Sequence, residues 1–418
     1  MNAPFTRGVE VVTFGCRLNL VESQAMRDAA QAAGERGAII VNTCAVTAES
    51  VRQARQTIRR IAREQPGARI IVSGCAAETE RAAFAQMPEV AAMIGNADKT
   101  DPAAWRALRA GALQARAIAQ ERTARPLDVT QIERHTRGLL AIQNGCDHRC
   151  TFCIIPYGRG PSRSLPAASV IEQARRLADA GAPEIVLTGV DLTSWGADLP
   201  QAPRLGALVR AILAEVPHLP RLRLSSLDCI EIDDDLLRAL ADEERLMPHL
   251  HLSLQAGDDL ILKRMKRRHS RADAVRLCAE LRRIRPDIAL GADLIAGFPT
   301  ETDAMAANTL ALVEDCGLTH LHVFPFSARP GAPAARMPQV ARALAAERAA
   351  RLREAGAKAL ARHLDAQIGR RLDILTERGG LGRARDFTPV ATPGAPPGQL
   401  IEGLAASHDG RRLALAAV

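Results

Sequence analysis

The sequence lacks long apolar runs and a secretory leader. No stretch approaches the roughly 18 uninterrupted apolar residues of a membrane-spanning helix, and the opening residues, MNAPFTRGVE, are not a charged and then apolar leader. We therefore expect a soluble, cytoplasmic protein with no membrane partner. Disulfides do not persist in that compartment, so clustered cysteines among the nine of this 418-residue chain are expected to bind metal or carry out redox chemistry.

Internal repeats and low-complexity tracts are also absent, which excludes a solenoid. The length predicts two or three domains. The net charge of +8 suits a polyanionic partner such as nucleic acid, although an Arg-rich and Ala-rich composition would produce the same charge without one.

Three cysteines, Cys146, Cys150 and Cys153, lie within the eight residues CDHRCTFC. A structural zinc site needs four ligands, commonly in two pairs, and no second Cys-x2-Cys or His-x3-His partner follows. Thiolates spaced Cys-x3-Cys-x2-Cys can instead hold three irons of a four-iron cluster and leave the fourth iron open. The spacing favours a cluster over zinc, and the run resembles the motif of the radical S-adenosylmethionine (SAM) family.

Six short apolar segments alternate with helix-compatible stretches from residue 139 onward: LLAIQNG, EIVLTGVDL, RLRLSSLD, HLHLSLQAG, IALGADLIAGF and HLHVFPFSA. Six such βα units predict a partial parallel barrel, in which ligands bind at the carboxyl ends of the strands. The cysteine run directly follows the first strand. Small or polar residues near the later strand ends are either ordinary strand termini or contacts to the methionine and ribose parts of SAM: Thr188, Gly189, Ser225, Ser253, Gln255 and Asp293.

A single cysteine also closes each of three apolar strands near the N-terminus. Cys16 ends EVVTFGC, Cys44 ends AIIVNTC and Cys75 ends RIIVSGC, and a helix-compatible segment follows each one. Because parallel strands end at one edge of a sheet, these thiols can converge and hold a second cluster, although any one of them could be a structural thiol. Three other cysteines lack this pattern and are interpreted as core residues: Cys229, Cys278 and Cys316.

The two three-cysteine sets together resemble the radical SAM methylthiotransferase family over nearly the whole chain. The matching segments are GCRLN, VNTCAVT, SGCAAE, QNGCDHRCTFCIIPYGRGPSRS, SLQAGDDLILKRMKRRH and DLIAGFPTET. The resemblance implies an α/β fold with an N-terminal flavodoxin-like parallel sheet (residues 1–125), a central partial (βα)6 radical SAM barrel (136–338) and a small C-terminal all-β TRAM-like domain (365–418). Residues 98–136 are expected to form a helical bridge and linker, and residues 339–366 a long helix.

Members of this family insert a methylthio group at an unreactive carbon–hydrogen bond. The resemblance implies two [4Fe-4S] clusters, one on each three-cysteine set, and two uses of SAM. One SAM methylates sulfur held on the N-terminal cluster, and a second SAM yields the radical that removes the substrate hydrogen. No catalytic residue beyond the cluster ligands is expected, and the identities of the electron donor and the sulfur source stay open.

Branches of the family modify isopentenyladenosine or threonylcarbamoyladenosine in tRNA, or an aspartate of a ribosomal protein. The segments NTCAVTAES, EIVLTGVDL and VFPFSARPGAPAA are most similar to the threonylcarbamoyladenosine branch. The expected target is therefore carbon 2 of that base, next to the anticodon. The other two branches, and a non-catalytic iron–sulfur binding or assembly protein, remain alternatives.

Basic segments are candidates for contact with tRNA phosphates. The first, which a solvated helix face would explain nearly as well, contains Arg55, Arg59, Arg60 and Arg63. The second contains Lys263, Lys266, Arg267 and Arg268.

Aromatic residues make up only 3% of the chain, so few side chains can stack on splayed bases. Tyr157, Phe324 and Phe326 are the candidates, with core packing as the alternative for both phenylalanines. Histidines that alternate along two predicted strands are interpreted as strand residues rather than metal ligands: His249, His251, His320 and His322.

Overall fold

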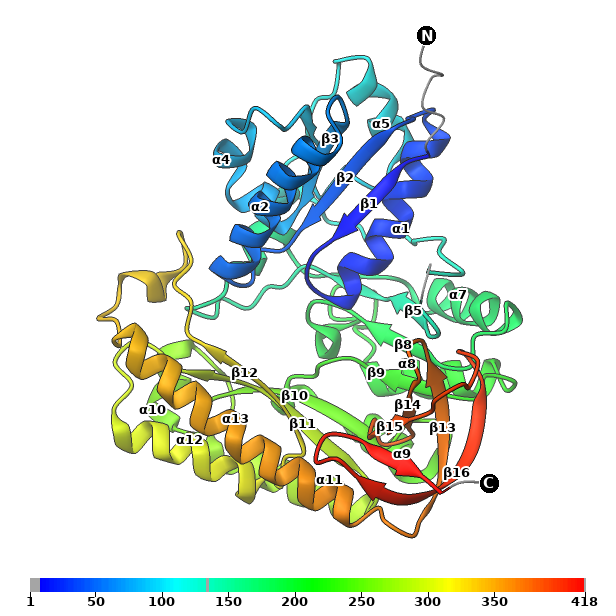
Figure 1. Cartoon of the computed structure of the whole chain (residues 1–418), viewed down its shortest axis with the longest axis vertical. Coiled ribbons are helices and arrows are strands. Elements are labelled where there is room, and N and C mark those ends of the chain that lie inside the picture. Colours follow the sequence, from blue (N-terminus) through cyan, green and yellow to red (C-terminus); the bar gives the residue numbers. More distant parts are fainter. Residues whose placement is uncertain (1–7, 133–134, 417–418) are drawn as a thin grey trace.

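The computed structural model describes residues 8–132 and 135–416, and its three parts follow one another along the chain (Figure 1). Residues 1–7, 133–134 and 417–418 fall within the predicted first domain, linker and last domain, and they lie outside the described residues. Among the described helices, none combines the length and the apolar character needed to cross a membrane.

The N-terminal part is a four-stranded parallel sheet, which confirms the predicted α/β architecture. Its strands are β1 (Glu10–Thr13), β2 (Ala38–Thr43), β3 (Arg69–Gly74) and β4 (Ala92–Met93), and they lie side by side in the order β1-β2-β3-β4. The order is sequential, so this sheet lacks the exchange of the first two strands that marks the flavodoxin order.

Helices cover both faces of this sheet (Figure 1). Ile40 of β2 packs in one cluster with Met26 of α1 (Arg17–Ala32), whereas the adjacent Val41 packs with Ile58 of α2 (Ala48–Glu64). Successive side chains of a strand point to opposite faces, so the two helices lie on opposite sides. The single helix predicted after the third strand is instead two short ones, α3 (Cys75–Thr79) and α4 (Arg81–Ala85), because Glu80 leaves helical geometry.

The predicted helical bridge is helical only in part. It contains α5 (Pro102–Arg109), which Asp101 caps, and one 3-10 turn, η1 (Ile118–Gln120). Beyond that turn, Val129 and Ile132 pack with Val21 of α1 and with the first barrel strand. The linker thus fills the space between the N-terminal sheet and the barrel.

The central part contains the six predicted parallel strands. They are β5 (Gly138–Ala141), β8 (Ile185–Thr188), β9 (Leu222–Leu224), β10 (His249–Gln255), β11 (Ala289–Ala296) and β12 (His320–Pro325). Backbone hydrogen bonds join β5, β8 and β9 in one sheet and β10, β11 and β12 in another. Isolated bridges, Leu222 to Leu246 and Leu227 to Leu252, join the two sheets into one open barrel.

Helices cover the outside of this barrel, and leucine and valine side chains fill the layer between them and the strands. The helices are α7 (Ala167–Asp179), α8 (Leu205–Glu215), α9 (Asp234–Asp242), α10 (Asp259–Met265), α11 (Arg271–Ile284) and α12 (Asp303–Asp315). Shorter elements flank the cysteine run: the antiparallel pair β6 (Gln143–Asn144) and β7 (Arg163–Ser164), and α6 (Ile155–Arg159).

The predicted long helix is α13 (Arg342–Asp365), which crosses beside β12 and leads to a small closed β-barrel (Figure 1). The barrel strands are β13 (Arg371–Glu377), β14 (Leu381–Ala384), β15 (Pro389–Ala391), β16 (Leu400–His408) and β17 (Leu413–Leu415). Ion pairs from Arg221 to Asp373 and from Arg137 to Glu377 attach it to residues that precede β9 and β5. The small barrel therefore lies at the amino ends of the central strands, opposite the cysteine run.

Candidate metal centres

The three N-terminal cysteines lie at the carboxyl ends of neighbouring parallel strands. Cys16 precedes α1, Cys44 follows β2, and Cys75 begins α3 directly after β3. Close backbone approaches bring these ends together: a Cβ added at Gly15 would lie 2.9 Å from the Cys44 Sγ, and one at Gly74 would lie 2.3 Å from the Thr43 carbonyl oxygen. Both glycines have positive φ, which suits residues without a Cβ.

The electrostatics of this set favour a bound cation. Burial, with a smaller effect from the neighbouring thiols of Cys75 and Cys16, raises the pKa of the Cys44 thiol to about 11. Three adjacent thiolates repel one another unless positive charge lies between them. A metal centre would supply that charge and keep the thiols deprotonated.

The second set is held by a tightly turned loop. Gly145 has φ +75°, and a Cβ there would lie 1.8 Å from the Pro161 carbonyl oxygen, so only glycine fits before Cys146. The Cys146 amide donates to the Gly160 carbonyl at 3.1 Å, and the Cys153 amide donates to the Cys150 carbonyl at the same distance. The loop thus closes on itself at both ends.

Burial raises the pKa of Cys146 and of Cys153, the latter to about 12. The Arg267 guanidinium lies 3.7 Å from the Cys150 Sγ and 2.9 Å from the Asp228 carboxylate. The sequence had suggested Arg267 as a phosphate contact, but its side chain is only 7% exposed and is directed at the cysteine loop. Positive charge beside a thiolate stabilises the deprotonated form that a metal requires.

His148, inside the cysteine run, is engaged by carboxylates. Its Nε2 lies 3.0 Å from Asp191 and 3.6 Å from Glu231. Hydrogen bonds to Asp191 and Glu231 raise the pKa of His148 to about 10, so the ring is a cation at neutral pH. A protonated imidazole cannot bind a metal, which leaves the three thiols as the donors of this loop.

A buried charged cluster joins the two cysteine sets. Arg159 of α6 is 2% exposed; its Nε donates to the Cys75 Sγ at 3.1 Å, and its terminal nitrogens donate to both Glu22 oxygens at 2.9 Å. Arg159 also donates to Asn144, which precedes the cysteine run by two residues, and to Asn19. The Arg159 guanidinium therefore contacts a cysteine of the first set, helix α1, and the residue that leads into the second set.

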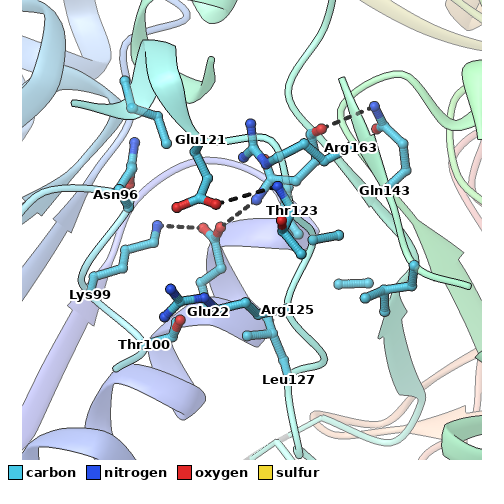
Figure 2. A pocket seen from close by; sticks show the side chains of 17 residues that line it. Glu22, Asn96, Lys99, Thr100, Glu121, Thr123, Arg125, Leu127, Gln143 and Arg163 are labelled. Atoms are coloured by element: carbon cyan, nitrogen blue, oxygen red, sulfur yellow. Dashed lines mark hydrogen bonds and ion pairs between the residues drawn. The ribbon is translucent and has the colours of Figure 1, made fainter. Parts of the chain in front are cut away.

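Lys99 completes this cluster. Figure 2 shows the Lys99 and Glu22 side chains directed toward one another at the wall of a small cavity, and their ion pair measures 2.6 Å. Burial alone would raise the pKa of Glu22, but Arg159 and Lys99 outweigh it and lower the pKa to about 2. Two cations thus face one carboxylate, and the remaining positive charge is directed toward Cys75.

Further contacts place the two sets next to each other. Ile154, which follows Cys153, packs in the same apolar cluster as Cys75, and a Cβ added at Gly158 would touch the Cys75 Cβ at 3.3 Å. The Asn96 side chain donates to the Gly158 carbonyl at 2.6 Å. Helices α3 and α6 therefore form the direct contact between the N-terminal sheet and the barrel.

The residues predicted to contact SAM lie at or near the carboxyl ends of the barrel strands. Thr188 and Ser225 are buried, and the Ser225 Oγ has no hydrogen-bond partner among the described residues. Gly189 abuts Gln143, and Gln255 has φ +68° at the end of β10. The Ser253 carbonyl accepts from Arg267 at 2.9 Å, so this strand end reaches the cysteine loop.

Asp293 lies deeper in the barrel and is already engaged. Its Oδ1 lies 3.0 Å from His251 Nε2 and 3.2 Å from His322 Nδ1. Burial would raise the pKa of Asp293, but these two histidines lower it below its usual value. Two of the four alternating histidines therefore contact a carboxylate that the sequence analysis had assigned to SAM.

Other predicted residues divide between core and surface. Cys229, Cys278 and Cys316 lie in the main barrel core, as interpreted from the sequence. Phe326 packs on Phe298 with ring centroids 5.5 Å apart, whereas Tyr157 and Phe324 are exposed. In the first basic segment, Arg55 is paired with Glu80 at 2.6 Å, so this arginine is engaged within the chain.

Several residues of the site were missed in the sequence. Glu22 and Lys99 carry no local spacing signal, because each acts through a contact with a distant segment. Gln143 and Asp191 lie within segments quoted from the sequence, but their contacts with each other's segment could not be predicted. Gln143 accepts from the amides of Val190 and Asp191 and donates to Ser162. Arg159 could have been found, since it lies within the segment quoted for the family resemblance, but its partners could not.

The donor sets fit iron–sulfur clusters. All nine cysteines are free thiols, and six of them belong to the two sets described above. Each group offers three sulfurs and, in its surroundings, charged groups rather than a fourth cysteine or a neutral histidine. This composition matches a four-iron cluster with one iron available to another ligand better than a closed tetrahedral zinc site.

Comparisons with known proteins identify both regions. Residues 140–313 match the model of the radical SAM superfamily, and residues 8–95 match that of the uncharacterized protein family UPF0004. The solved structure of the radical SAM methyltransferase TsrM from Kitasatospora setae, with cobalamin and a [4Fe-4S] cluster bound, aligns with this chain with a TM-score of 0.54 at 16% identity. The alignment covers 87% of this chain and 73% of the TsrM chain, and the likeness concerns the fold alone.

Curated relatives are similar along most of their length. The threonylcarbamoyladenosine tRNA methylthiotransferase MtaB of Rickettsia prowazekii is 45% identical over 91% of this chain and 90% of its own, and that of Bacillus subtilis is 35% identical over 78% and 74%. The tRNA-2-methylthio-N(6)-dimethylallyladenosine synthase of Agrobacterium fabrum is 33% identical over 90% and 88%. With both three-thiol sets present, the chain belongs to the radical SAM methylthiotransferase family.

Proposed function

We propose that this protein attaches a methylthio group to carbon 2 of N6-threonylcarbamoyladenosine next to the anticodon of tRNA. The observation that carries the proposal is the pair of three-thiol sets, joined through Arg159 at one end of the barrel. The chain is 45% identical to a relative named for this activity and 33% identical to one named for the dimethylallyladenosine reaction. The higher identity favours threonylcarbamoyladenosine over isopentenyladenosine as the substrate.

The proposed cofactors are SAM and two [4Fe-4S] clusters. Cys146, Cys150 and Cys153 would hold the cluster that binds SAM, and the N-terminal set of three would hold the other. The SAM contacts are proposed at the strand ends, where the unpartnered Ser225 hydroxyl and the positive φ of Gln255 support them: Thr188, Gly189, Ser225, Ser253 and Gln255. Asp293 would act only through its histidine partners.

The target bond explains why such cofactors are needed. A carbon–hydrogen bond on an aromatic ring has no useful acidity, so a positioned histidine or carboxylate could not remove this hydrogen by base catalysis. When bound, SAM on a low-potential cluster supplies an organic radical strong enough to break the bond. The side chains of the protein therefore bind, orient and exclude water, and no acid or base is assigned.

Particular residues would perform these tasks. Arg159 keeps the first cysteine set against the second, and Gln143 holds the turn that carries Asp191 against the cysteine loop. Arg267 places positive charge beside Cys150, where added electron density on the sulfur would be stabilised. Rigid charged contacts of this kind limit movement between the two sites. Such rigidity is required if the same tRNA nucleobase must reach both sites.

We further propose the division into residues 1–125, 136–338 and 365–418 as three domains, joined by the linker and α13. Exposed Tyr157 beside the cysteine loop and exposed Phe324 are proposed to stack on RNA bases, and exposed Lys263 and Lys266 to contact phosphates. The electron donor and the sulfur source are separate partners that these contacts do not identify.

Nucleoside mass spectrometry tests the proposal. The host should lack its own methylthiotransferases but make both threonylcarbamoyladenosine and isopentenyladenosine, and its tRNA is analysed with and without this gene. We expect only the methylthio form of threonylcarbamoyladenosine to appear. A Cys150→Ala variant is the inactive control, and Cys278→Ala, in the core, is the matched cysteine control.

Modification of isopentenyladenosine instead would contradict the substrate but keep the family chemistry. If neither nucleoside changed while SAM cleavage to 5′-deoxyadenosine persisted, the ribosomal-protein branch would replace this proposal. Absence of SAM cleavage as well would favour the non-catalytic iron–sulfur protein.

A further inference from the structure

A cavity of about 380 Å³ occupies the inside of the open barrel and is lined mainly by nitrogen-bearing side chains. Its walls include Arg17 of α1, Arg223 of β9, His249 of β10, His320 of β12, Arg353 of α13 and Arg383 of the small barrel. No Asp or Glu is among the described residues that line it. The volume falls in the range of small-ligand sites, and the lining carries one sign of charge.

Two of the four arginines of this cavity are paired, Arg223 with Glu184 at 2.6 Å and Arg383 with Glu377 at 3.7 Å, and two are not. Among the described residues, the Arg17 side chain has no ion pair or hydrogen bond, and the Arg353 side chain donates only to the Val323 carbonyl at 3.0 Å. The nearby carboxylates are already engaged: Glu184 by Arg223 at 2.6 Å, and Asp293 by two histidines. The guanidinium groups of Arg17 and Arg353 therefore keep donors available to a ligand.

Several residues of this lining also carry buried polar atoms without partners. His249 is 5% exposed and neither of its ring nitrogens has a hydrogen-bond partner, and Arg223 is 1% exposed with an unpartnered Nη1. The His320 Nε2 is also unpartnered. These atoms lie behind the surface of the cavity, so the donors that a ligand can reach are those of Arg17 and Arg353.

The cavity lies at the amino ends of the barrel strands, next to the small barrel, and it reaches the N-terminal part at Arg17. Arg17 directly follows Cys16, so the same turn that presents a thiol to the first cysteine set sends a guanidinium into the cavity. Phe387 of the small barrel lies at the other end, in ring contact with His249 at 4.9 Å. A base held near Cys16 could thus extend a substituent into the barrel toward these donors.

We infer that this cavity binds the carboxylate of the N6-threonylcarbamoyl group, and that Arg17 and Arg353 determine specificity for an acidic N6 substituent. The inference rests on the proposed function. Arginine pairs with carboxylate in a two-bond geometry that no other cation matches, and neither Arg17 nor Arg353 has an ion pair among the described residues to give up. A neutral isopentenyl group would leave these groups unpaired, so the same lining would reject it.

Two anticodon stem–loop RNAs test this inference, one carrying threonylcarbamoyladenosine and the other its neutral methyl ester. The rate of methylthio product formation at low RNA concentration gives kcat/KM for each RNA with the reconstituted protein. We expect the wild type to prefer the acid by about 10- to 100-fold, the usual range for losing one charge-assisted contact. Arg17→Gln and Arg353→Gln should lower kcat/KM for the acid and bring the acid-to-ester ratio toward one.

Arg351→Gln is the matched control, because Arg351 is exposed on the same helix and lies outside the lining of this cavity. Its ratio should equal that of the wild type. Iron content and RNA-independent SAM cleavage are measured for each variant, since Arg17 adjoins Cys16.

The inference is overturned if the wild type does not distinguish acid from ester, or if the two variants slow both RNAs equally. If the wild type modifies neither RNA despite full iron content and SAM cleavage, the proposed function itself fails. A lower ratio in Arg353→Gln with normal iron content supports the inference even if Arg17→Gln loses its first cluster.

Discussion

Replacing Arg159 by methionine should separate the two cysteine sets. The substitution removes the hydrogen bonds to Cys75, Asn144 and both Glu22 oxygens, and it leaves the buried Glu22 carboxylate with Lys99 and the Asn144 amide. Removing one partner of a buried ion pair costs about 3–5 kcal/mol. A change of 1 kcal/mol shifts the melting temperature of a domain of 150–250 residues by about 2–4 °C, so Tm should fall by about 6–20 °C.

Differential scanning calorimetry of the anaerobically reconstituted protein measures this shift. Arg175→Met is the control, because Arg175 makes an exposed pair with Glu172, and exposed pairs contribute about 0–1 kcal/mol. The double variant Glu22→Gln with Arg159→Met should be less destabilised than the sum of the two single variants, since each single variant loses the same contact between Arg159 and Glu22. A loss of less than about 2 °C for Arg159→Met would refute the reasoning, because it would mean that the cluster is not structurally coupled.

Three further perturbations have defined outcomes. Gly145→Ala should abolish iron binding at the adjacent loop, because the added Cβ would collide with the Pro161 carbonyl oxygen. The control Gly181→Ala, at a residue with positive φ but open space, should lower the free energy of unfolding by only about 1–2 kcal/mol and keep the iron. Equal iron loss in both variants would contradict this prediction. The pKa of His148 is raised to about 10, so the protein with His148 should be more stable than the His148→Gln variant below pH 6.5 and should lose this advantage as pH rises through 10. The Tm of both proteins is measured against pH, and a Tm difference independent of pH would be inconsistent with a charged ring. Ser270→Ala should cost about 1 kcal/mol in urea unfolding, because it removes a capping box, and an unchanged midpoint would argue against that cap.

Most of the architecture could be predicted from the sequence because it follows from local patterns. Each of the six apolar segments became a barrel strand, since runs of leucine, isoleucine and valine between helical stretches fit a sheet that is covered outside. The single helix expected after Cys75 failed because Glu80 leaves helical geometry, and its side chain binds Arg55 and Arg329, contacts set by the tertiary structure.

The site was predictable only where chemistry is encoded by spacing. Six cysteines could be singled out, because three lie in one short loop and three close equivalent strands. The contacts among Arg159, Glu22 and Lys99 could not be predicted, because they join residues 77 and 137 positions apart. For the same reason Arg267 looked like a surface cation, although it is buried beside Cys150.

The iron content of three anaerobically reconstituted proteins tests the central claim that two separate thiol sets hold two clusters. The proteins are the wild type, a variant with Cys16, Cys44 and Cys75 all changed to alanine, and a variant with Cys146, Cys150 and Cys153 changed in the same way. Each variant should retain about half of the wild-type iron, because three thiolates suffice for one cluster. Full retention in either variant, or complete loss from both, would contradict the assignment of two independent centres.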